Sequence, residues 1–299
     1  MSKHLLNFST TLATAVTLLA APAAHAQITT PQPSPKSTVT QRVGLTDVTI
    51  VYSRPSVKGR PIFGDSTTKA VVPFGQRWRT GANATTSIKF SDDVTVEGKK
   101  VPAGEYGIYT IPGKTQWTVV LNKALKQGSE VKGFKKADDV ASFIVKPYKL
   151  GSKVETFTIG FVDLTPATAN VALEWELTGV KFKVVADVDT KVMAQIDEKI
   201  TKSASPAPVD LASAAVYYLD NNKDLKQALA WIEKANAAEP TKFWNLNTEA
   251  KIRLKMKDYA GATKAAEASK KAALAATPPN AEYAKMNDEL VAEAKKMGK

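Results

Sequence analysis

A change of composition near the middle of the chain constrains its fold more than any other feature. Residues 38–187 contain 21 valines and 11 alanines, whereas residues 209–299 contain 3 valines and 22 alanines. Branched side chains favour strands and alanine favours helices, so the two parts call for different secondary structures. We therefore predict a multi-domain chain in which an all-β part is followed by an all-α part.

The valine-rich part alternates apolar and polar residues with a period of two, which is typical of strands with one buried face. The alternation is clearest in 171–177, where Val171, Leu173 and Trp175 would face a core. Similar runs occur at 48–52, 88–90, 117–121, 157–161 and 180–185. Turn signals such as Thr178-Gly179 separate the runs.

An antiparallel β-sandwich of about eight to ten strands is the architecture that these runs favour, because one-sided strands need a second apolar face. A closed barrel is the alternative. Across the turn at Thr178-Gly179, we expect Glu174 and Glu176 to form ion pairs with Lys181 and Lys183.

Residues 188–202 break the strand pattern. Val188, Val192, Met193, Ile196 and Ile200 recur at helical spacing. They predict one amphipathic helix that closes the β-domain.

The alanine-rich part repeats with a period of 34 residues, because Lys223-Asp224-Leu225 aligns with Lys257-Asp258-Tyr259. Ala228 and Ala262 align as well, and small residues at such positions let paired helices approach closely. Residues 209–278 therefore resemble two tetratricopeptide-like units, with 279–297 as a capping helix. A plain alanine-rich bundle is the alternative. Two units are fewer than the roughly three that a free-standing array needs, so we expect the tail to lean on the β-domain.

Six aromatic residues of the tail are expected to pack between helices, and the alternative is a concave groove for a protein partner. They are Tyr217, Tyr218, Trp231, Phe243, Trp244 and Tyr259.

The N-terminus has the pattern of a secretory signal peptide. Lys3 and His4 precede an apolar run, and Ala24-His25-Ala26 forms a small-residue cleavage site before Gln27. Polar residues interrupt the run, which argues against the alternative of a membrane anchor. We expect an exported protein, periplasmic or secreted after cleavage near Ala26/Gln27, without a transmembrane anchor.

Together these patterns divide the chain into five parts. We assign 1–26 to the signal peptide, 27–37 to a flexible leader, 38–202 to the β-sandwich domain with its closing helix, 203–208 to a linker and 209–299 to the helical domain.

The composition excludes several chemistries. Cysteine is absent, and the only histidines, His4 and His25, fall in the predicted signal peptide. A Ser-His-Asp triad, a cysteine nucleophile and a histidine- or thiolate-bound metal are therefore not available to the mature chain. We expect no metal and no cofactor, and we favour a non-enzymatic protein. The formal net charge of +12 suits anionic partners, although nucleic acid is not expected for an exported protein.

The stretch 52–84 concentrates positive charge, with six basic residues and one acidic residue among glycine- and proline-rich loops. Guanidinium groups match carboxylates or phosphates, and an indole offers a flat face to a sugar ring. The predicted ligand-binding residues are Arg54, Lys58, Arg60, Trp78, Arg79 and Asn83. Under the alternative, the arginines fix the loops by bonding to backbone carbonyls or to Asp47 and Asp163, and Trp78 belongs to the core.

Residues 52–64 and 73–83, together with Gly98-Lys99 and 102–106, resemble an exported bacterial family known as domain of unknown function 2911. The resemblance covers about 38–186. It implies export, a β-rich domain and often a helical repeat tail, but no reaction, because none is established for the family. The family has tyrosine where this chain has Phe74, so a hydroxyl is not indispensable there.

A second candidate site is a group of four carboxylates, Asp92, Asp93, Glu97 and Glu105. They could hold Ca²⁺ or form the acid pair of a glycosidase. Neighbouring strand residues point to opposite faces, so the alternative is a solvated turn.

The preferred function is an anion- or acidic-sugar-binding β-domain with a helical tail that docks a protein partner. One alternative is a structural or assembly factor whose arginines are internally paired. The other is a carboxylate-based glycan hydrolase.

Overall fold

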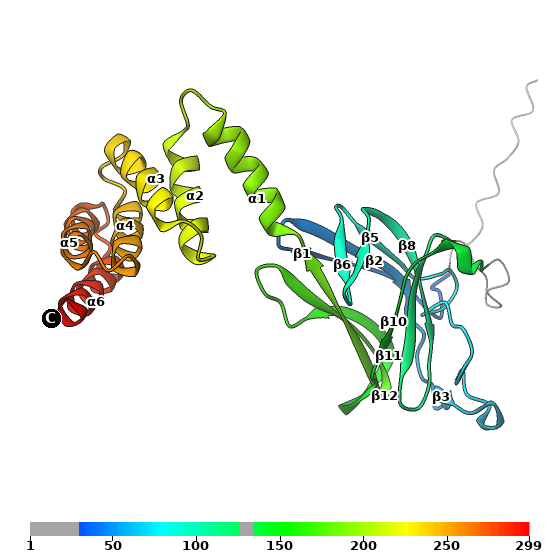
Figure 1. The fold of residues 1–299 in the computed structure, drawn as a ribbon. Coiled ribbons are helices and arrows are strands. Elements are labelled where there is room, and N and C mark those ends of the chain that lie inside the picture. The colour runs from blue at the N-terminus through cyan, green and yellow to red at the C-terminus, as the bar shows by residue number, and fades with distance from the viewer. Residues whose placement is uncertain (1–29, 126–133, 299) are drawn as a thin grey trace, which may run out of the picture.

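The structure is a computed structural model that describes residues 30–125 and 134–298. It contains a β-sandwich and a stack of helices, joined by helix α1, Val188–Ile196 (Figure 1). The predicted signal peptide, residues 1–26, lies outside the described residues. Among the residues that are described, no helix has both the length and the apolar character needed to cross a bilayer.

Two antiparallel sheets form the sandwich. The first has six strands in the order β1-β2-β5-β8-β9-β10, and the second has four in the order β11-β12-β6-β7. The first sheet comprises β1 Lys36–Val43, β2 Thr46–Ser53, β5 Ser87–Phe90, β8 Gly104–Ile111, β9 Trp117–Asn122 and β10 Asp139–Val145. The second comprises β6 Val94–Val96, β7 Lys99–Val101, β11 Tyr148–Val162 and β12 Thr168–Ala186. Two short strands, β3 Phe63–Gly64 and β4 Val72–Pro73, pair in parallel outside these sheets.

The core lies between the inner faces of the two sheets. Ile50, Ile88 and Leu121 of the first sheet and Phe157 and Phe182 of the second are almost completely buried in one cluster. These residues come from the runs whose alternation predicted a buried face. The predicted antiparallel sandwich is therefore confirmed, and the sheets do not close into a barrel.

Strand β12 corrects one part of the sequence analysis. The turn predicted at Thr178-Gly179 is absent, because β12 continues through it. The change of phase in the alternation arises instead near Glu176, which has a φ of 57° and where the register with β11 shifts. Gly179 marks a close approach rather than a turn, since a Cβ there would lie 2.5 Å from the ring of Tyr148.

The expected cross-strand ion pairs are consequently wrong. Glu174 and Lys181 lie on the same strand, β12. The Lys181 ammonium pairs with Asp163 at 2.6 Å, and Glu174 accepts a hydrogen bond from the Tyr148 hydroxyl at 3.3 Å.

Helix α1 contributes to the cores on both of its sides. It begins after Asp187, whose carboxylate accepts a hydrogen bond from the backbone N–H of Thr190, and a π-helical turn, Asp197–Thr201, continues it. Val188 packs against the core of the sandwich. Ile196 and Ile200 belong instead to the core of the helical tail.

Ion pairs fix both ends of this connection. The Lys191 ammonium lies 2.5 Å from Asp92 and donates a hydrogen bond to the carbonyl of Leu45, which ties α1 to the sandwich. Asp189 accepts from the Lys223 ammonium at 2.7 Å and from the Tyr217 hydroxyl at 2.8 Å, which ties the tail to α1. These contacts connect the tail to the sandwich through α1, whereas helices α2 to α6 do not pack extensively on the described strands, as the tail was expected to do.

The tail is a succession of helices, each packed against the next. They are α2 Pro208–Asp220, α3 Leu225–Ala238, α4 Phe243–Lys255, α5 Tyr259–Ala275 and α6 Ala281–Met297. The 34-residue period has a direct structural meaning, because Asp224 and Asp258 cap the N-termini of α3 and α5 with their side chains. Ala228 and Ala262, the matched small residues, are buried.

A buried polar network joins the last three helices. The Asn287 amide accepts from Asn247 at 2.9 Å and donates to the Ser269 hydroxyl at 2.8 Å and to the Tyr283 carbonyl at 2.7 Å. The Ser269 hydroxyl in turn donates to the carbonyl of Phe243 at 2.7 Å. Alanine-rich helices bury little apolar area, so this network specifies how they pack.

We predict that Asn287→Leu lowers the free energy of unfolding by about 2 kcal/mol, because it leaves buried polar partners unsatisfied. Urea denaturation followed by circular dichroism measures the change. Glu289→Leu, at an exposed position of the same helix α6, serves as the control and should be nearly neutral. Equal effects of the two substitutions would contradict the role assigned to the network.

Candidate functional site

Two loops of the β-domain enclose a hollow of about 480 Å³. One loop spans 54–62 and follows β2, and the other spans 74–86 and follows β4. Three arginines from the two loops line the hollow, Arg60, Arg77 and Arg79. The remaining lining residues are Ser34, Pro55, Val71, Val72, Pro73, Gln76, Trp78, Gly81, Ala82 and Trp175.

Buried threonines hold the second loop in place. The backbone of Trp78 exchanges two hydrogen bonds with Thr110 of β8, at 2.8 and 3.0 Å. Thr80 is fully buried with a φ of 58°, and its carbonyl accepts a hydrogen bond from the Thr86 hydroxyl. Gly81 follows at a φ of 157°, where an added Cβ would lie 3.1 Å from the carbonyl of Ser53. Arg79 is thus attached to a rigid backbone.

An aromatic cluster forms the inner wall of the hollow. The ring of Trp78 stacks on Trp175 with centroids 5.8 Å apart, and Phe157 packs 5.1 Å from Trp78. The Trp78 indole N–H donates to the carbonyl of Gly81 at 2.9 Å. Trp78 is only 8% exposed, so the predicted flat face for a sugar ring is already covered by other aromatic residues.

Arg79 is held without an acidic partner. Its Nε atom is buried and has no hydrogen-bond partner, and burial lowers the pKa of its guanidinium. Within 30–125 and 134–298, the structure describes no ion pair to Arg79. Because an arginine side chain stays protonated, the inner part of the hollow carries an uncompensated positive charge.

The other two arginines of the hollow have local contacts. Arg60 donates from Nε to the carbonyl of Val57 at 3.1 Å and from Nη2 to that of Ser56 at 2.6 Å. The Arg77 guanidinium lies over the ring of Phe134, with Cζ 3.4 Å from the ring centroid. Both side chains belong to exposed residues at the rim.

The remaining predicted residues lie beside the hollow and do not line it. Arg54 donates to the carbonyl of Phe157 at 3.1 Å and to the hydroxyl of Thr158 at 2.8 Å, which ties its loop to β11. Asn83 donates to the carbonyl of Ser34 at 3.0 Å. Lys58 is exposed, and its backbone N–H donates to the carboxylate of Glu155 at 2.8 Å.

The acids expected to hold these arginines have other partners. Asp47 lies 3.6 Å from Arg42, and Asp163 pairs with Lys181. Arg54 and Arg60 instead donate hydrogen bonds to backbone carbonyls, and Arg54 donates to a threonine hydroxyl as well.

Three of the four carboxylates of the second candidate site have contacts that are separate from one another. Asp92 pairs with Lys191 of α1, and the hydrogen bond from this lysine is the main cause that lowers the pKa of Asp92. Asp93 accepts from the backbone N–H of Ala103 at 2.8 Å, and Glu97 accepts from that of Lys183 at 2.6 Å.

Glu105, the fourth, lies opposite Lys89 of β5. Within the described part of the chain, no group of three His, Cys, Asp or Glu residues could hold a metal ion. The predicted carboxylate site therefore does not assemble around an ion.

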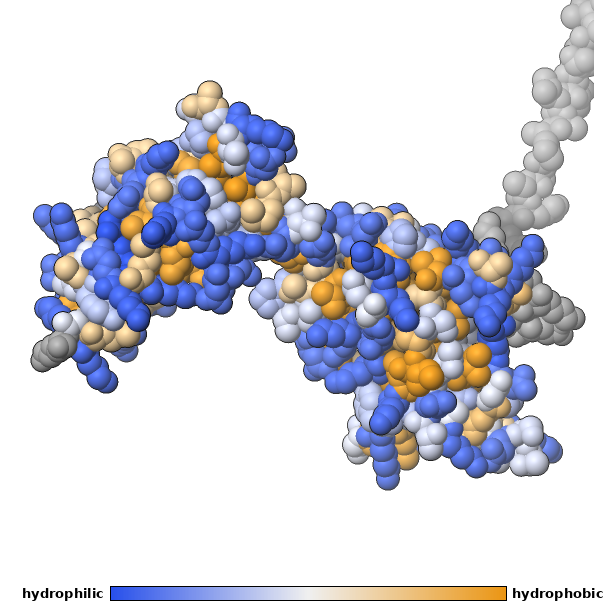
Figure 2. Space-filling model, in the orientation of Figure 1, coloured by the Kyte–Doolittle hydropathy of each residue, from blue (hydrophilic) through white to orange (hydrophobic). Residues whose placement is uncertain are grey.

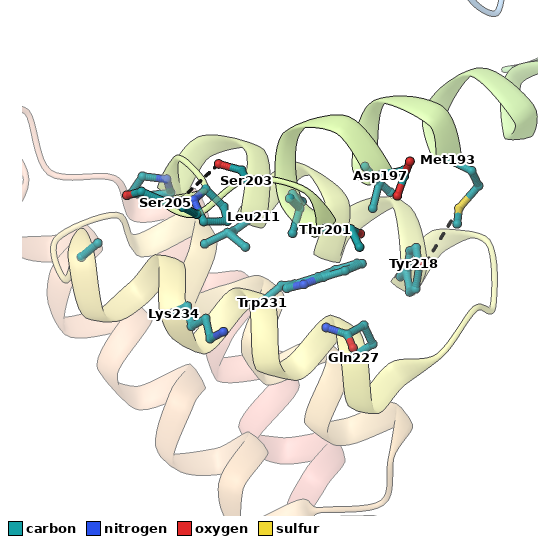
Figure 3. Close-up of a pocket in the computed structure, with 16 residues that line it drawn as sticks. Met193, Asp197, Thr201, Ser203, Ser205, Leu211, Tyr218, Gln227, Trp231 and Lys234 are labelled. Atoms are coloured by element: carbon teal, nitrogen blue, oxygen red, sulfur yellow. Dashed lines mark hydrogen bonds between the residues drawn. The ribbon is translucent and has the colours of Figure 1, made fainter.

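A second hollow, of about 870 Å³, lies in the helical tail between α1 with its π-helical turn and helices α2 and α3 (Figure 3). Trp231 and Tyr218 point into it and contact each other edge to face, with centroids 4.8 Å apart. Lys234 and Gln227 line the same wall from α3. Trp231 is buried, as predicted, whereas Trp244 is 43% exposed and lies under the ammonium of Lys242.

In the orientation of Figure 1, hydrophilic and hydrophobic residues are mixed over both parts of the protein, and hydrophobic residues gather at one place on the β-domain (Figure 2).

The fold defines a two-part protein, a β-sandwich with an arginine-lined hollow and an appended helical stack. The chain belongs to the family described as "Protein of unknown function (DUF2911)", whose model matches residues 34–184. The match covers the sandwich and both loops, in agreement with the resemblance found in the sequence. Comparison with curated proteins gave no match, and comparison with solved structures gave none.

Sequence reasoning missed Trp175 and Arg77 as lining residues. Trp175 belongs to an alternating strand, so its pattern predicts only that it is buried, and it lies almost 100 residues from Arg79. Arg77 has no sequence feature that separates it from the other basic residues of the loops. Of the predicted ligand-binding residues, Arg60, Trp78 and Arg79 line the hollow.

We predict that Arg54→Ala lowers the free energy of unfolding by more than about 1 kcal/mol, because it removes two hydrogen bonds between the loop and β11. It should leave anion binding unchanged in the folded protein. Arg42→Ala, which removes an exposed ion pair, is the matched control and should change stability by less than about 0.5 kcal/mol. Chemical denaturation of the two variants gives the comparison, and a neutral Arg54→Ala would contradict the structural role.

Proposed function

We propose that this chain is an exported, non-enzymatic protein whose β-domain binds a small anionic molecule in the hollow between its two basic loops. The observation that carries the proposal is Arg79, a partly buried cation of the hollow for which the described residues supply no acidic partner. The signal-peptide pattern of 1–26 supports export.

The burial of Arg79 distinguishes it from the other loop arginines. An exposed arginine gains little from an anion in water, whereas a cation in a region of low dielectric attracts an anion strongly. Arg54 and Arg60 already donate to carbonyls, so they support the walls. Arg79 has buried donor capacity that an anion would satisfy.

The hollow has the size and composition of a small-molecule site. Its volume of about 480 Å³ falls within the roughly 300–1,000 Å³ typical of ligand pockets. Proline, valine and alanine side chains supply apolar walls, and none of its lining residues in the described part of the chain is acidic. Arg60 and Arg77 at the rim add positive charge that favours the approach of an anion.

The proposal includes a docking role for the helical tail. The hollow beneath α1 combines Trp231 and Tyr218 with Lys234. This combination suits a peptide segment that carries an apolar side chain beside an acidic one. The tail would thus link the anion-binding domain to a protein partner.

We predict that an anion that fits the hollow raises the melting temperature of the mature protein, and that Arg79→Ala abolishes this rise. Saturation at 100 times Kd stabilises a folded protein by about 2.7 kcal/mol, which a thermal-shift assay resolves. The assay uses glucuronate, benzoate and inorganic phosphate, with glucose as the uncharged comparison.

Arg42→Ala removes one positive charge far from the hollow and is the matched control. It should retain the full rise in melting temperature. If Arg79→Ala responds to the three anions as the unsubstituted protein does, the hollow is not the binding site.

A further inference from the structure

Two of the buried donors at the arginine-lined hollow are unpaired. The described residues contain three buried polar side-chain atoms without a hydrogen-bond partner, which are Arg79 Nε, Trp175 Nε1 and Asn236 Oδ1. The first two belong to residues that line the hollow, and the third lies in the tail. Buried donors in folded proteins are nearly always paired, so their coincidence at one hollow requires an explanation.

The neighbouring tryptophan shows that the fold can satisfy an indole at this place. Trp78 stacks on Trp175 with an interplanar angle of 17°, and its N–H donates to Gly81. Trp175 is more deeply buried, at 1% exposed, yet its N–H has no acceptor. An indole nitrogen can only donate, so a ligand that brings an acceptor into the hollow would satisfy it.

The residues that line the hollow define the chemical properties that a ligand with such an acceptor must have. The lining residues, as far as the structure describes the chain, include no carboxylate, and Arg79 adds a positive charge to the same lining as Trp175. Apolar side chains such as Val72 and Ala82 belong to this lining as well. A suitable ligand therefore joins a negatively charged acceptor group to a body that tolerates apolar walls.

We propose that the ligand is a small carboxylate, and that its carboxylate group accepts hydrogen bonds from Arg79 Nε and Trp175 Nε1. This inference rests on the proposed function and specifies its ligand class. A planar, singly charged carboxylate matches the side edge of a guanidinium. A phosphate would bring more charge and more oxygen atoms than two buried donors can satisfy, and its desolvation is more costly.

The test follows the five indole N–H resonances in proton–nitrogen NMR spectra of the full mature chain. The Trp175 resonance is assigned by its absence from the Trp175→Phe spectrum. Glucuronate and benzoate are titrated against inorganic phosphate, and calorimetry gives the affinities. We expect a carboxylate to shift the Trp175 resonance, and Trp175→Phe to weaken carboxylate binding at least tenfold.

Trp117→Phe is the matched control for loss of indole volume. Trp117 is also buried in the sandwich, at 3% exposed, but it does not line the hollow. It should retain carboxylate binding. Arg79→Lys tests the other donor, because lysine keeps the charge but lacks the Nε donor, and we expect it to weaken binding as well.

The outcomes separate this inference from the proposed function. If Arg79→Ala abolishes carboxylate binding while Trp175→Phe binds normally, the Trp175 assignment is wrong and the anion site remains. Trp175 would then have a packing role only, against the perpendicular ring of Phe63, whose centroid lies 6.1 Å from that of Trp175. If phosphate binds and both carboxylates fail, the ligand class is wrong. If none of the probes binds at millimolar concentration, the inference and the proposed function both fail.

Discussion

The stacking of Trp78 on Trp175 is the interaction on which the arrangement of the β-domain's loops depends. It joins a loop that leaves the two-stranded β3–β4 ladder to the middle of β12 in the opposite sheet. The same loop is bridged to β8 through Thr110, so it contacts both layers of the sandwich. A loop fixed at two layers can hold a charged side chain such as Arg79 at a partly buried position, where a free loop would let it turn to solvent.

The molecule separates two uses of arginine that look alike in the sequence. Arg54 and Arg60 donate hydrogen bonds to nearby backbone carbonyls, so their side chains help to hold the loop that forms a wall of the hollow. Arg79 lines the hollow, and the described residues supply no hydrogen-bond partner for its Nε. The position of an arginine in the sequence motif therefore does not indicate whether it supports a loop or is available to a ligand. Its hydrogen-bond partners in the structure do.

Sequence periodicity predicted the two-part fold because burial follows the period of each secondary structure. Val48, Ile50 and Trp175 are buried as their alternation requires, and the Asp224 and Asp258 caps follow the 34-residue repeat. The error at Thr178-Gly179 has a physical cause. A bulge and a turn both shift the phase of an alternating pattern, and only the partner strand decides between them. The sequence could not predict that Trp175 lines the hollow, for a similar reason. The pattern of a single strand does not indicate which distant loop packs on it.

Helix α1 has a consequence for how the molecule can be divided. Its first turn lies on the sandwich, whereas Ile196 and Ile200 complete the hydrophobic centre of the tail. Cleavage within 203–208 would leave both isoleucines exposed on the sandwich fragment. It would also remove their side chains from the core of the helical tail. Both parts of the protein therefore depend on α1, and the folding of each part depends on the presence of the other.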